Sequence, residues 1–415
     1  MISPSWTPPN LFSGSKRGKR VARFDLLVLF LGVFVGILGM GAVLGLGIYD
    51  WFKNKHNYCL VLDENFDGPL NTDLWKHDVQ VGGFGTGEFE WTTTSPNNSF
   101  TKDGFLHIVP TLTADVIGEA AMLNGYTVNL TDSKTCTAEP VPWVDRSQSL
   151  DLAEQAIGNA DTNCQIRSNS TIGTIIPPVQ SARLTTNGTF SMKYGRVEVR
   201  AKMPTGDWLW PAVWMMPRDS VYGIWPRSGE IDIFESKGNM PTSRSQLLAN
   251  TMNSALHFGT ESADDQFAKF RGVATLWRNF WNQGFHTFGL EWDEQGIWTW
   301  RESRAKKVLI TKFNEPFINK MPLVQAAAGN YIPGANPWSI SNSSAAPFDQ
   351  EFFLILNVAV GGTNGFFADV GQPWSNSDST ARRTFWNQKE SWLPSWGDET
   401  QRAMQVDYVK AWKQC

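Results

Sequence analysis

The segment Gly229–Ser236 reads Gly-Glu-Ile-Asp-Ile-Phe-Glu-Ser and places three carboxylates in a short apolar run. Side chains in a strand alternate between its two faces, so Glu230 and Asp232 face one way and the isoleucines the other. A regular strand would put Glu235 on the apolar face, which is costly for an isolated charge. One extra residue, a β-bulge at Ile233–Phe234, returns Glu235 to the acidic face. We therefore predict a bulged strand with all three acids on one surface.

Two carboxylic acids on one face are what a glycosidase needs if it retains the anomeric configuration. One carboxylate attacks the anomeric carbon and the other protonates the leaving oxygen, which requires the groups to lie about 5–5.5 Å apart. Four strand steps of roughly 3.3 Å put the Cα atoms of Glu230 and Glu235 about 13 Å apart, so converging side chains on a curved strand must close the gap. We expect Asp232 to hydrogen-bond the nucleophile and to help hold the two acids in different protonation states.

An acidic run with this spacing has two simpler interpretations, a solvated strand edge or a calcium-binding face. The flanking residues favour a sugar site, because aromatic rings stack on the C–H faces of pyranoses. Trp225 lies five residues before Glu230, and Trp210 and Trp214 lie in an apolar stretch further upstream. For each tryptophan taken alone, packing in the core is the alternative.

Together these stretches resemble glycoside hydrolase family 16, in particular its laminarinase-like branch with a bulged catalytic strand. The resemblance covers about residues 60–415 and is close to animal β-1,3-glucan recognition proteins and to their active glucanase relatives. Many of the recognition proteins lack the catalytic glutamates, whereas this chain keeps both. The matching stretches follow the family's order: 195–202, 210–214, 228–235, 256–259, 286–292 and 355–362.

The resemblance implies an all-β fold, a concanavalin A-like jelly-roll β-sandwich with a concave sugar groove. It assigns Glu230 as the nucleophile, Glu235 as the acid/base and Asp232 as the assisting carboxylate.

The same resemblance suggests residues that contact the substrate. Stacking walls are expected from Trp225, Trp210 and Trp214. His257 is expected to contact a sugar hydroxyl or the leaving oxygen, with a structural histidine as the alternative. We expect His286 to be structural. For Glu291, one interpretation is a surface or sheet-edge carboxylate, and no conclusion rests on it.

Composition excludes several other functions. The chain has 415 residues with a net charge of -4 and 18% charged residues, which gives no basic surface for nucleic acid. It carries no Walker loop for a nucleotide, and its five histidines are too scattered to predict a metal site. The 20 tryptophans suit a carbohydrate-binding protein. We expect no cofactor, and a structural calcium ion is left open.

The N-terminal region predicts a membrane anchor. Residues 26–48 carry no charge and are almost wholly apolar or glycine, long enough to span a bilayer core. A cleaved secretory signal is the competing interpretation, but its apolar region is usually about 7–15 residues long. The basic run before the span keeps residues 1–25 cytosolic. We expect a single-pass type II protein, with a stalk at 49–58 and one lumenal or extracellular domain at 59–415.

Two further patterns agree with this topology. Sequons for N-glycosylation all lie beyond the span, at Asn97, Asn129, Asn169, Asn187 and Asn342. The four cysteines also follow the span, and an oxidising compartment favours two disulfides. We prefer Cys136–Cys164, which closes an irregular loop, and Cys59–Cys415, because the ends of a jelly-roll domain should lie side by side.

Short stretches of β-type alternation predict most of the domain. We expect a first strand and turn at 60–68, and strands at 105–110, 196–202, 208–216, 230–235, 253–259, 285–292, 296–301, 307–312, 351–360 and 404–413. A helical turn or two is expected within 267–282. Residues 113–180 lack clean periodicity, and we expect a disulfide-held surface loop region there.

The function that these observations favour is a membrane-anchored, endo-acting, retaining β-glucan hydrolase or transglycosylase, acting on β-1,3 or mixed β-1,3/1,4 linkages. A non-catalytic β-1,3-glucan receptor on the same fold is the main alternative. The intact pair of Glu230 and Glu235 argues against it, because a lectin has no use for a costly buried acid pair. A calcium-dependent structural domain would leave the tryptophan-rich flanks unexplained.

Overall fold

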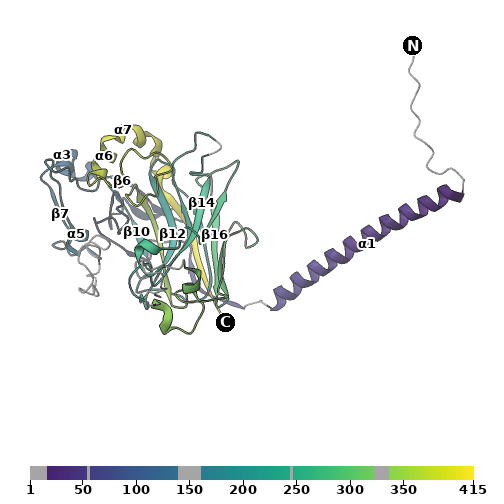
Figure 1. The fold of residues 1–415 in the computed structure, drawn as a ribbon. Coiled ribbons are helices and arrows are strands. Elements are labelled where there is room, and N and C mark those ends of the chain that lie inside the picture. Colours follow the sequence, from purple (N-terminus) through teal and green to yellow (C-terminus); the bar gives the residue numbers. More distant parts are fainter. Residues whose placement is uncertain (1–15, 54–56, 139–159, 244–245, 322–335) are drawn as a thin grey trace, which may run out of the picture. The chain divides into compact units, whose positions relative to one another are not determined.

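The structure is a computed structural model that describes residues 16–53, 57–138, 160–243, 246–321 and 336–415 (Figure 1). The chain divides into two units, residues 1–57 with Cys415, and Tyr58–Gln414. In the first unit the helix α1 covers Lys16–Lys53. It contains a stretch, Leu26–Gly45, that is long and apolar enough to cross a membrane. A signal sequence near an N-terminus has the same properties. Residues 1–15 of the expected tail and 54–56 of the expected stalk lie outside the described residues.

The second unit is built on two antiparallel sheets. The seven-stranded sheet has the order β15 (Arg271–Thr275), β14 (Thr251–His257), β13 (Glu230–Ser236), β12 (Leu209–Pro217), β19 (Phe352–Val360), β10 (Arg183–Thr185) and β2 (Lys76–His77). The eight-stranded sheet has the order β18 (Lys307–Lys312), β17 (Gly296–Arg301), β16 (His286–Asp293), β11 (Gly195–Lys202), β20 (Met404–Gln414), β5 (Phe105–Ile108) and β4 (Ser99–Lys102), and β1 (Tyr58–Glu64) pairs with β20.

The two sheets bury one core between them, as alternation along the strands requires. In β11, Val197 and Val199 are fully buried while the polar residues between them are partly exposed. Ile231 and Ile233 of β13 belong to the same buried cluster. Each such side chain removed from water contributes about 1.5–3 kcal/mol. The predicted all-β sandwich is confirmed.

Most predicted strands agree with the structure to within about two residues, including β14 and β16 to β20. The helical turn expected within 267–282 is wrong. That stretch contains the edge strand β15, whose five residues pair with β14. Local periodicity is a weak signal at such a short edge strand, and pairing decides its conformation.

The region 113–180 is more ordered than the predicted surface loop. Its described part includes a small two-stranded sheet, β7 (Thr127–Asn129) and β8 (Gln165–Arg167), and a strand of the three-stranded sheet β3 (Glu90–Thr92), β9 (Val179–Ser181) and β6 (Thr111–Leu112). These elements surround a second buried cluster that includes Met122 and Ile176. Residues 139–159 of the expected loop lie outside the described residues.

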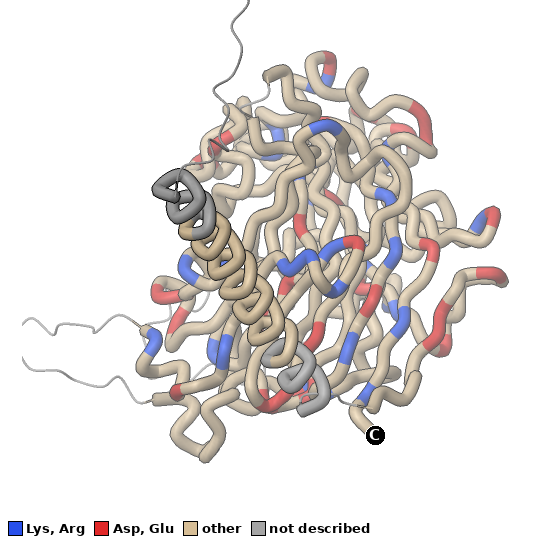
Figure 2. The backbone as a smooth tube through the Cα atoms, turned by 90° about the vertical axis from the view of Figure 1, so that its right-hand side faces the viewer, with Lys and Arg blue, Asp and Glu red and all other residues tan. Residues whose placement is uncertain are grey.

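Short helices occupy the connections. They are α2 (Ala114–Ile117), α3 (Glu119–Leu123), α5 (Ala160–Cys164), α6 (Ala381–Asn387), α7 (Lys389–Trp392), α8 (Glu399–Arg402) and the 3₁₀ turns at Ser262–Asp264, Phe317–Lys320, Pro337–Ile340 and Leu393–Trp396. Basic and acidic positions are intermingled over the face of the domain that Figure 2 presents.

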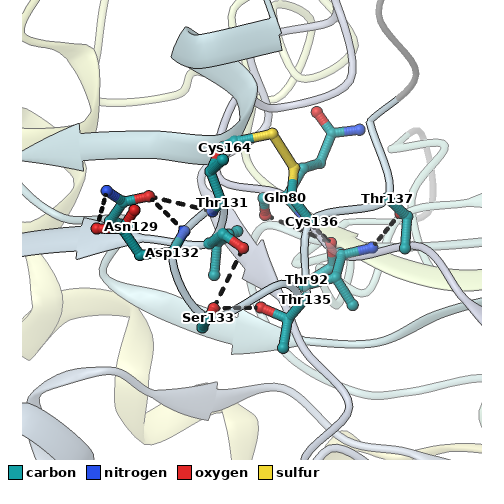
Figure 3. Close-up of a disulfide and its surroundings, with 12 residues drawn as sticks. Gln80, Thr92, Asn129, Thr131, Asp132, Ser133, Thr135, Cys136, Thr137 and Cys164 are labelled. Carbon is teal, nitrogen blue, oxygen red and sulfur yellow. Dashed lines mark hydrogen bonds between the residues drawn. A yellow bond between two sulfur atoms is a disulfide. The ribbon is translucent and has the colours of Figure 1, made fainter.

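Both predicted disulfides are supported. Cys136 and Cys164 are bonded, with their Cα atoms 5.6 Å apart (Figure 3). No cysteine of the chain is free. Cys59 and Cys415 are also disulfide-bonded, and they are the two cysteines that remain. Beside the first bridge, Thr137 accepts a hydrogen bond from the Val79 amide at 2.8 Å, and this bond connects the disulfide-closed region to the segment before it.

Candidate active site

The three acids of β13 lie on one face of the seven-stranded sheet, as predicted. Glu230 pairs with His257 of β14, and Glu235 pairs with Asn253. His257 and Asn253 are four residues apart, so both face the same side. On β13 the step between these partners is five residues, which requires one extra residue. The predicted bulge is therefore confirmed, and it is accommodated within the buried stretch Ile233–Phe234.

A glycine sets the entry into this strand. Gly229 has a φ of 81°, in the left-handed region that other residues avoid. A Cβ atom added there would lie 3.0 Å from Cε1 of Phe348, a tight contact that would require the Phe348 ring to shift. The turn delivers Glu230 as the first residue of β13.

Glu235 is placed to act as the acid. Its Oε1 atom accepts a hydrogen bond from the indole N–H of Trp210 at 2.9 Å. Burial, helped by the negative charge of Glu230, raises the pKa of Glu235 to about 7, although the Trp210 bond and the charge of His257 act in the opposite direction. A carboxyl group with this pKa holds its proton in a substantial fraction of molecules at neutral pH, which general acid catalysis requires.

Glu230 has different surroundings. The indole N–H of Trp225 donates to its Oε2 atom at 2.8 Å, and its Oε1 atom lies 3.8 Å from Nε2 of His257. The Trp225 hydrogen bond and the nearby imidazole surround Glu230 with groups that favour interaction with a carboxylate.

Asp232 is almost completely buried, with 2% of its surface exposed. Its Oδ2 atom lies 3.1 Å from Nε2 of His257. Burial and the charges of Glu235 and Glu230 raise the pKa of Asp232 well above its ordinary value. We expected a hydrogen bond between Asp232 and Glu230. Among the described contacts, Asp232 instead lies against His257.

His257 has no nitrogen left for a sugar. Its Nδ1 atom lies 2.6 Å from Oδ2 of Asp265, and its Nε2 atom faces Asp232. The predicted contact between His257 and the substrate stays a prediction. Sequence reasoning missed Asp265, because an aspartate in a polar loop eight residues after the histidine carries no distinctive signal.

The three predicted tryptophans all belong to the site face. Trp225 is 38% exposed and Trp210 is 8% exposed. Trp210 stacks on Phe366 with ring centroids 3.9 Å apart, so little of its ring remains open to a ligand. Trp214 pairs with Asp232 across β12 and β13. Their contacts with a glucan remain predictions.

Trp214 is oriented by residues that sequence reasoning did not single out. Its indole donates to Oδ1 of Asn357 at 2.8 Å. The guanidinium of Arg183 lies 4.6 Å from the Trp214 ring centroid and 4.1 Å from that of Phe84. These partners come from β19, from β10 and from the loop after β2, far apart in the chain.

One group of potential metal-binding atoms occurs among the described residues. Atoms of Glu230, Asp232 and His257 lie within 4.8 Å of one another. Calcium takes six to eight oxygen ligands, and a set that includes an imidazole does not fit that preference. The structural calcium ion therefore stays an untested prediction.

Two residues outside the site complete the comparison with the sequence. His286 contacts Glu302 through its Nδ1 atom and packs against Trp281, in line with a structural role. The surface or sheet-edge interpretation of Glu291 is wrong, because this carboxylate is only 1% exposed and both of its oxygens accept hydrogen bonds from Arg304. No pattern in the sequence indicates that Arg304, from a loop, would cover Glu291.

The predicted glycosylation sites remain predictions. Asn97, Asn187 and Asn342 are exposed, and Asn129 and Asn169 are partly exposed. All five side chains lie at or near the surface of the domain.

Comparisons with known proteins agree with this geometry. The sequence profile of glycosyl hydrolases family 16 matches residues 152–308. The chain is 39% identical over 364 residues to the "Beta-1,3-glucan-binding protein" of Penaeus monodon, covering 86% of this chain and 90% of that protein. It is 35% identical over 237 residues to the "Glucan endo-1,3-beta-glucosidase" of Cryptopygus antarcticus, covering 56% of this chain and 66% of that one.

The fold agrees as well. The catalytic domain of an endo-1,3-β-glucanase (laminarinase) from Thermotoga petrophila superposes with a TM-score of 0.50 at 21% identity, covering 87% of this chain and 99% of that domain. At this identity the match speaks for the jelly-roll fold alone. On the extent of the match to the Penaeus protein, together with the family profile, this chain belongs to glycoside hydrolase family 16.

Proposed function

We propose that the protein is an endo-acting β-glucan hydrolase with a retaining mechanism. The observation that carries this proposal is that Glu230 and Glu235 share one face of β13 but have different surroundings. Glu235 has a pKa raised to about 7 by burial, while Glu230 receives an indole N–H and lies near the imidazole of His257. Two carboxyl groups whose surroundings differ in this way can take different roles at one pH.

In the first step the Glu230 carboxylate attacks the anomeric carbon. The bond from that carbon to the glycosidic oxygen breaks, and the leaving oxygen takes the proton of Glu235. In the second step Glu235, now ionised, removes a proton from water, and the water oxygen attacks the same carbon. The ester bond to Glu230 then breaks, and two inversions give net retention. A sugar hydroxyl in place of water would make the same intermediate a transglycosylase.

The substrate class comes from the relatives. The names of the Penaeus and Cryptopygus proteins both refer to β-1,3-glucan. A glucan with β-1,3 or mixed β-1,3/1,4 linkages is therefore the proposed substrate. Exposed Trp225 beside Glu230 offers a ring for a pyranose face.

The proposed location is a membrane, with helix α1 as an uncleaved anchor and the domain outside the cytosol. The apolar stretch Leu26–Gly45 and the basic residues before it support this topology. Treatment of a membrane fraction with an endoglycosidase should increase the electrophoretic mobility of the protein. An unchanged mobility, or a freely soluble protein, would contradict the topology.

A second candidate is a β-1,3-glucan receptor without catalysis. It is favoured by the name of the Penaeus relative, which is a binding protein. The retained Glu230 and Glu235 speak for the enzyme.

One experiment separates the two candidates. Full-length protein in detergent is incubated with laminarin, lichenan and pustulan, and the products are separated by size. The enzyme should release oligosaccharides of intermediate length from laminarin, and Glu230→Gln should release none. Binding to laminarin with no products from the wild-type protein would establish the receptor instead.

A further inference from the structure

We propose that Asp265 is a positioning residue that holds His257 as a fixed imidazolium against Asp232, and that this cation balances the carboxylates of the active site. The inference deepens the proposed function and rests on it for its catalytic consequence. The structural part, a doubly protonated histidine clamped between two carboxylates, can be tested without any activity.

The contacts of the ring carry the proposal. Nδ1 of His257 lies 2.6 Å from Asp265, and Nε2 lies 3.1 Å from Asp232. In the proposed state the proton between His257 and Asp232 lies on Nε2, so that both carboxyl groups face the ring as acceptors and the imidazole carries a proton on each nitrogen. Such a ring is a cation.

Two aromatic rings hold the imidazole in place. Phe267 stacks on it with centroids 5.0 Å apart and planes only 9° from parallel. Trp225, which also donates to Glu230, lies 5.8 Å away at a tilt of 42°. A 180° flip of the ring would keep this stacking but would put carbon atoms where the two nitrogens now face Asp265 and Asp232. The aromatic rings therefore fix the plane of the imidazole, and the two carboxyl groups fix the direction in which its nitrogens point.

The loop that carries Asp265 is built to present it. Its Oδ1 atom accepts hydrogen bonds from the amides of Phe258 at 3.2 Å and Phe267 at 3.3 Å, which leaves Oδ2 for His257. The neighbouring Asp264 closes the loop by accepting from the Thr260 amide at 2.7 Å. A Cβ atom at Gly259 would lie 2.3 Å from Oδ1 of Asp264, so the closure needs a glycine there.

The charges around His257 favour the cation. Burial alone would disfavour it, but Glu230 and Asp232 from β13 and Asp265 from the loop outweigh that cost and raise the pKa of His257 well above its ordinary value. In return, the charge of His257 lowers the pKa of Asp232 and of Glu235. Without the cation, the site would gather uncompensated negative charge around the residue that must deliver a proton.

The first test observes the ring directly. Full-length protein labelled with ¹⁵N-histidine contains five histidines, and His257→Gln identifies the signal of interest in detergent micelles. We expect both nitrogens of His257 to remain protonated at pH 8 in the wild type. In Asp265→Asn the same ring should become neutral between pH 6 and 8, and Asp265→Glu should restore the cation in part. A neutral His257 in the wild type at pH 7, or an unchanged cation in Asp265→Asn, would overturn the proposal.

The second test reads the catalytic consequence. Loss of the cation raises the pKa of Glu235, so the alkaline limb of kcat/KM on laminarin should move to higher pH by about 0.5–1 unit in Asp265→Asn. The rate below the limb should fall about tenfold, because Asp232 then faces a neutral imidazole in place of a cation. Glu261→Gln removes one charge from the same loop without touching His257 and should match the wild type. Equal profiles for Asp265→Asn and Glu261→Gln would refute the positioning role.

The proposed function and the proposal about His257 can be contradicted independently. A wild-type protein that releases no product from any glucan contradicts the proposed function, while the histidine spectrum still decides whether Asp265 holds a cation. An active enzyme with a neutral His257 contradicts only this inference.

Discussion

Two glutamates in opposite sheets, Glu291 and Glu235, differ in how the structure compensates their carboxyl groups. Glu291 of β16 is 1% exposed, and both of its oxygens accept hydrogen bonds from the guanidinium of Arg304. Glu235 of β13 accepts one hydrogen bond from the neutral indole of Trp210. The positive charge of Arg304 compensates the Glu291 carboxylate. Glu235 has no such cationic hydrogen-bond partner in the described part of the chain.

The two glutamates differ in how their charge is compensated, and Glu235 is also the more exposed of the two. A buried carboxylate with a bidentate arginine partner has its charge compensated and contributes to structure. A buried carboxyl group without such a partner shifts toward its neutral form, and Glu235 accordingly has a pKa of about 7. A group that titrates near the working pH can give and then take a proton, so the missing compensation supports the acid/base role proposed for Glu235.

The largest effect is expected when the nucleophile is removed. Glu230→Gln keeps the size of the side chain and its bond from Trp225 but cannot form the covalent intermediate. We expect kcat on laminarin to fall by about 10³-fold or more. Binding of laminarin, measured by affinity electrophoresis, and the unfolding midpoint should stay close to wild type. Undiminished turnover would falsify the catalytic assignment.

Removal of the acid should have an effect that depends on the leaving group. Glu235→Ala should slow hydrolysis of laminarin by about 10²–10⁴-fold, because a sugar leaving group needs a proton. An aryl glycoside with an acidic phenol should be affected much less. Added azide should restore turnover of the aryl substrate and give a β-glycosyl azide. An α-azide, identified by NMR, would show that the reaction inverts and that Glu230 is misassigned.

Loss of the compensating arginine should make Glu291 resemble Glu235. Arg304→Leu leaves a buried carboxylate without its partner, and we expect the free energy of unfolding to fall by about 1–3 kcal/mol. The effect stays below that of a fully buried pair because the Arg304 side chain is 53% exposed and water screens it.

Kinetics and a second variant test that interpretation. Glu291 lies outside the site, so kcat/KM of Arg304→Leu at low temperature should be unchanged. Adding Glu291→Leu should recover much of the stability in urea unfolding. A double variant less stable than Arg304→Leu would mean that Glu291 has other partners.

The smallest effect concerns the single donor of Glu235. In the wild type, kcat/KM should decline as pH rises through about 7, because Glu235 must be protonated to act and loses its proton there. The Trp210 bond lowers this pKa, so Trp210→Phe should move the alkaline limb to higher pH by less than about one unit. Trp214→Phe, which removes a donor that serves Asn357, should leave the limb in place. A downward shift in Trp210→Phe would contradict the proposed environment of Glu235.

Local patterns in the sequence determined a large part of this protein. The alternation of polar and apolar residues is a local property of a strand, so β11, β13 and most strands after Thr251 could be predicted from it. The bulge at Ile233–Phe234 followed from the cost of burying a charge on the wrong face. The positions of the cysteines after the apolar span were enough to suggest the disulfides.

Only the tertiary structure decided how each acid is compensated. Asp265 reaches His257 through a closed loop, Trp210 reaches Glu235 across a strand pair, and Arg304 covers Glu291 from a hairpin turn. Whether a carboxyl group is ionised depends on burial and on the charges within a few ångströms of it. Those distances are set by the packing of segments far apart in the chain, and no local pattern of residues contains them.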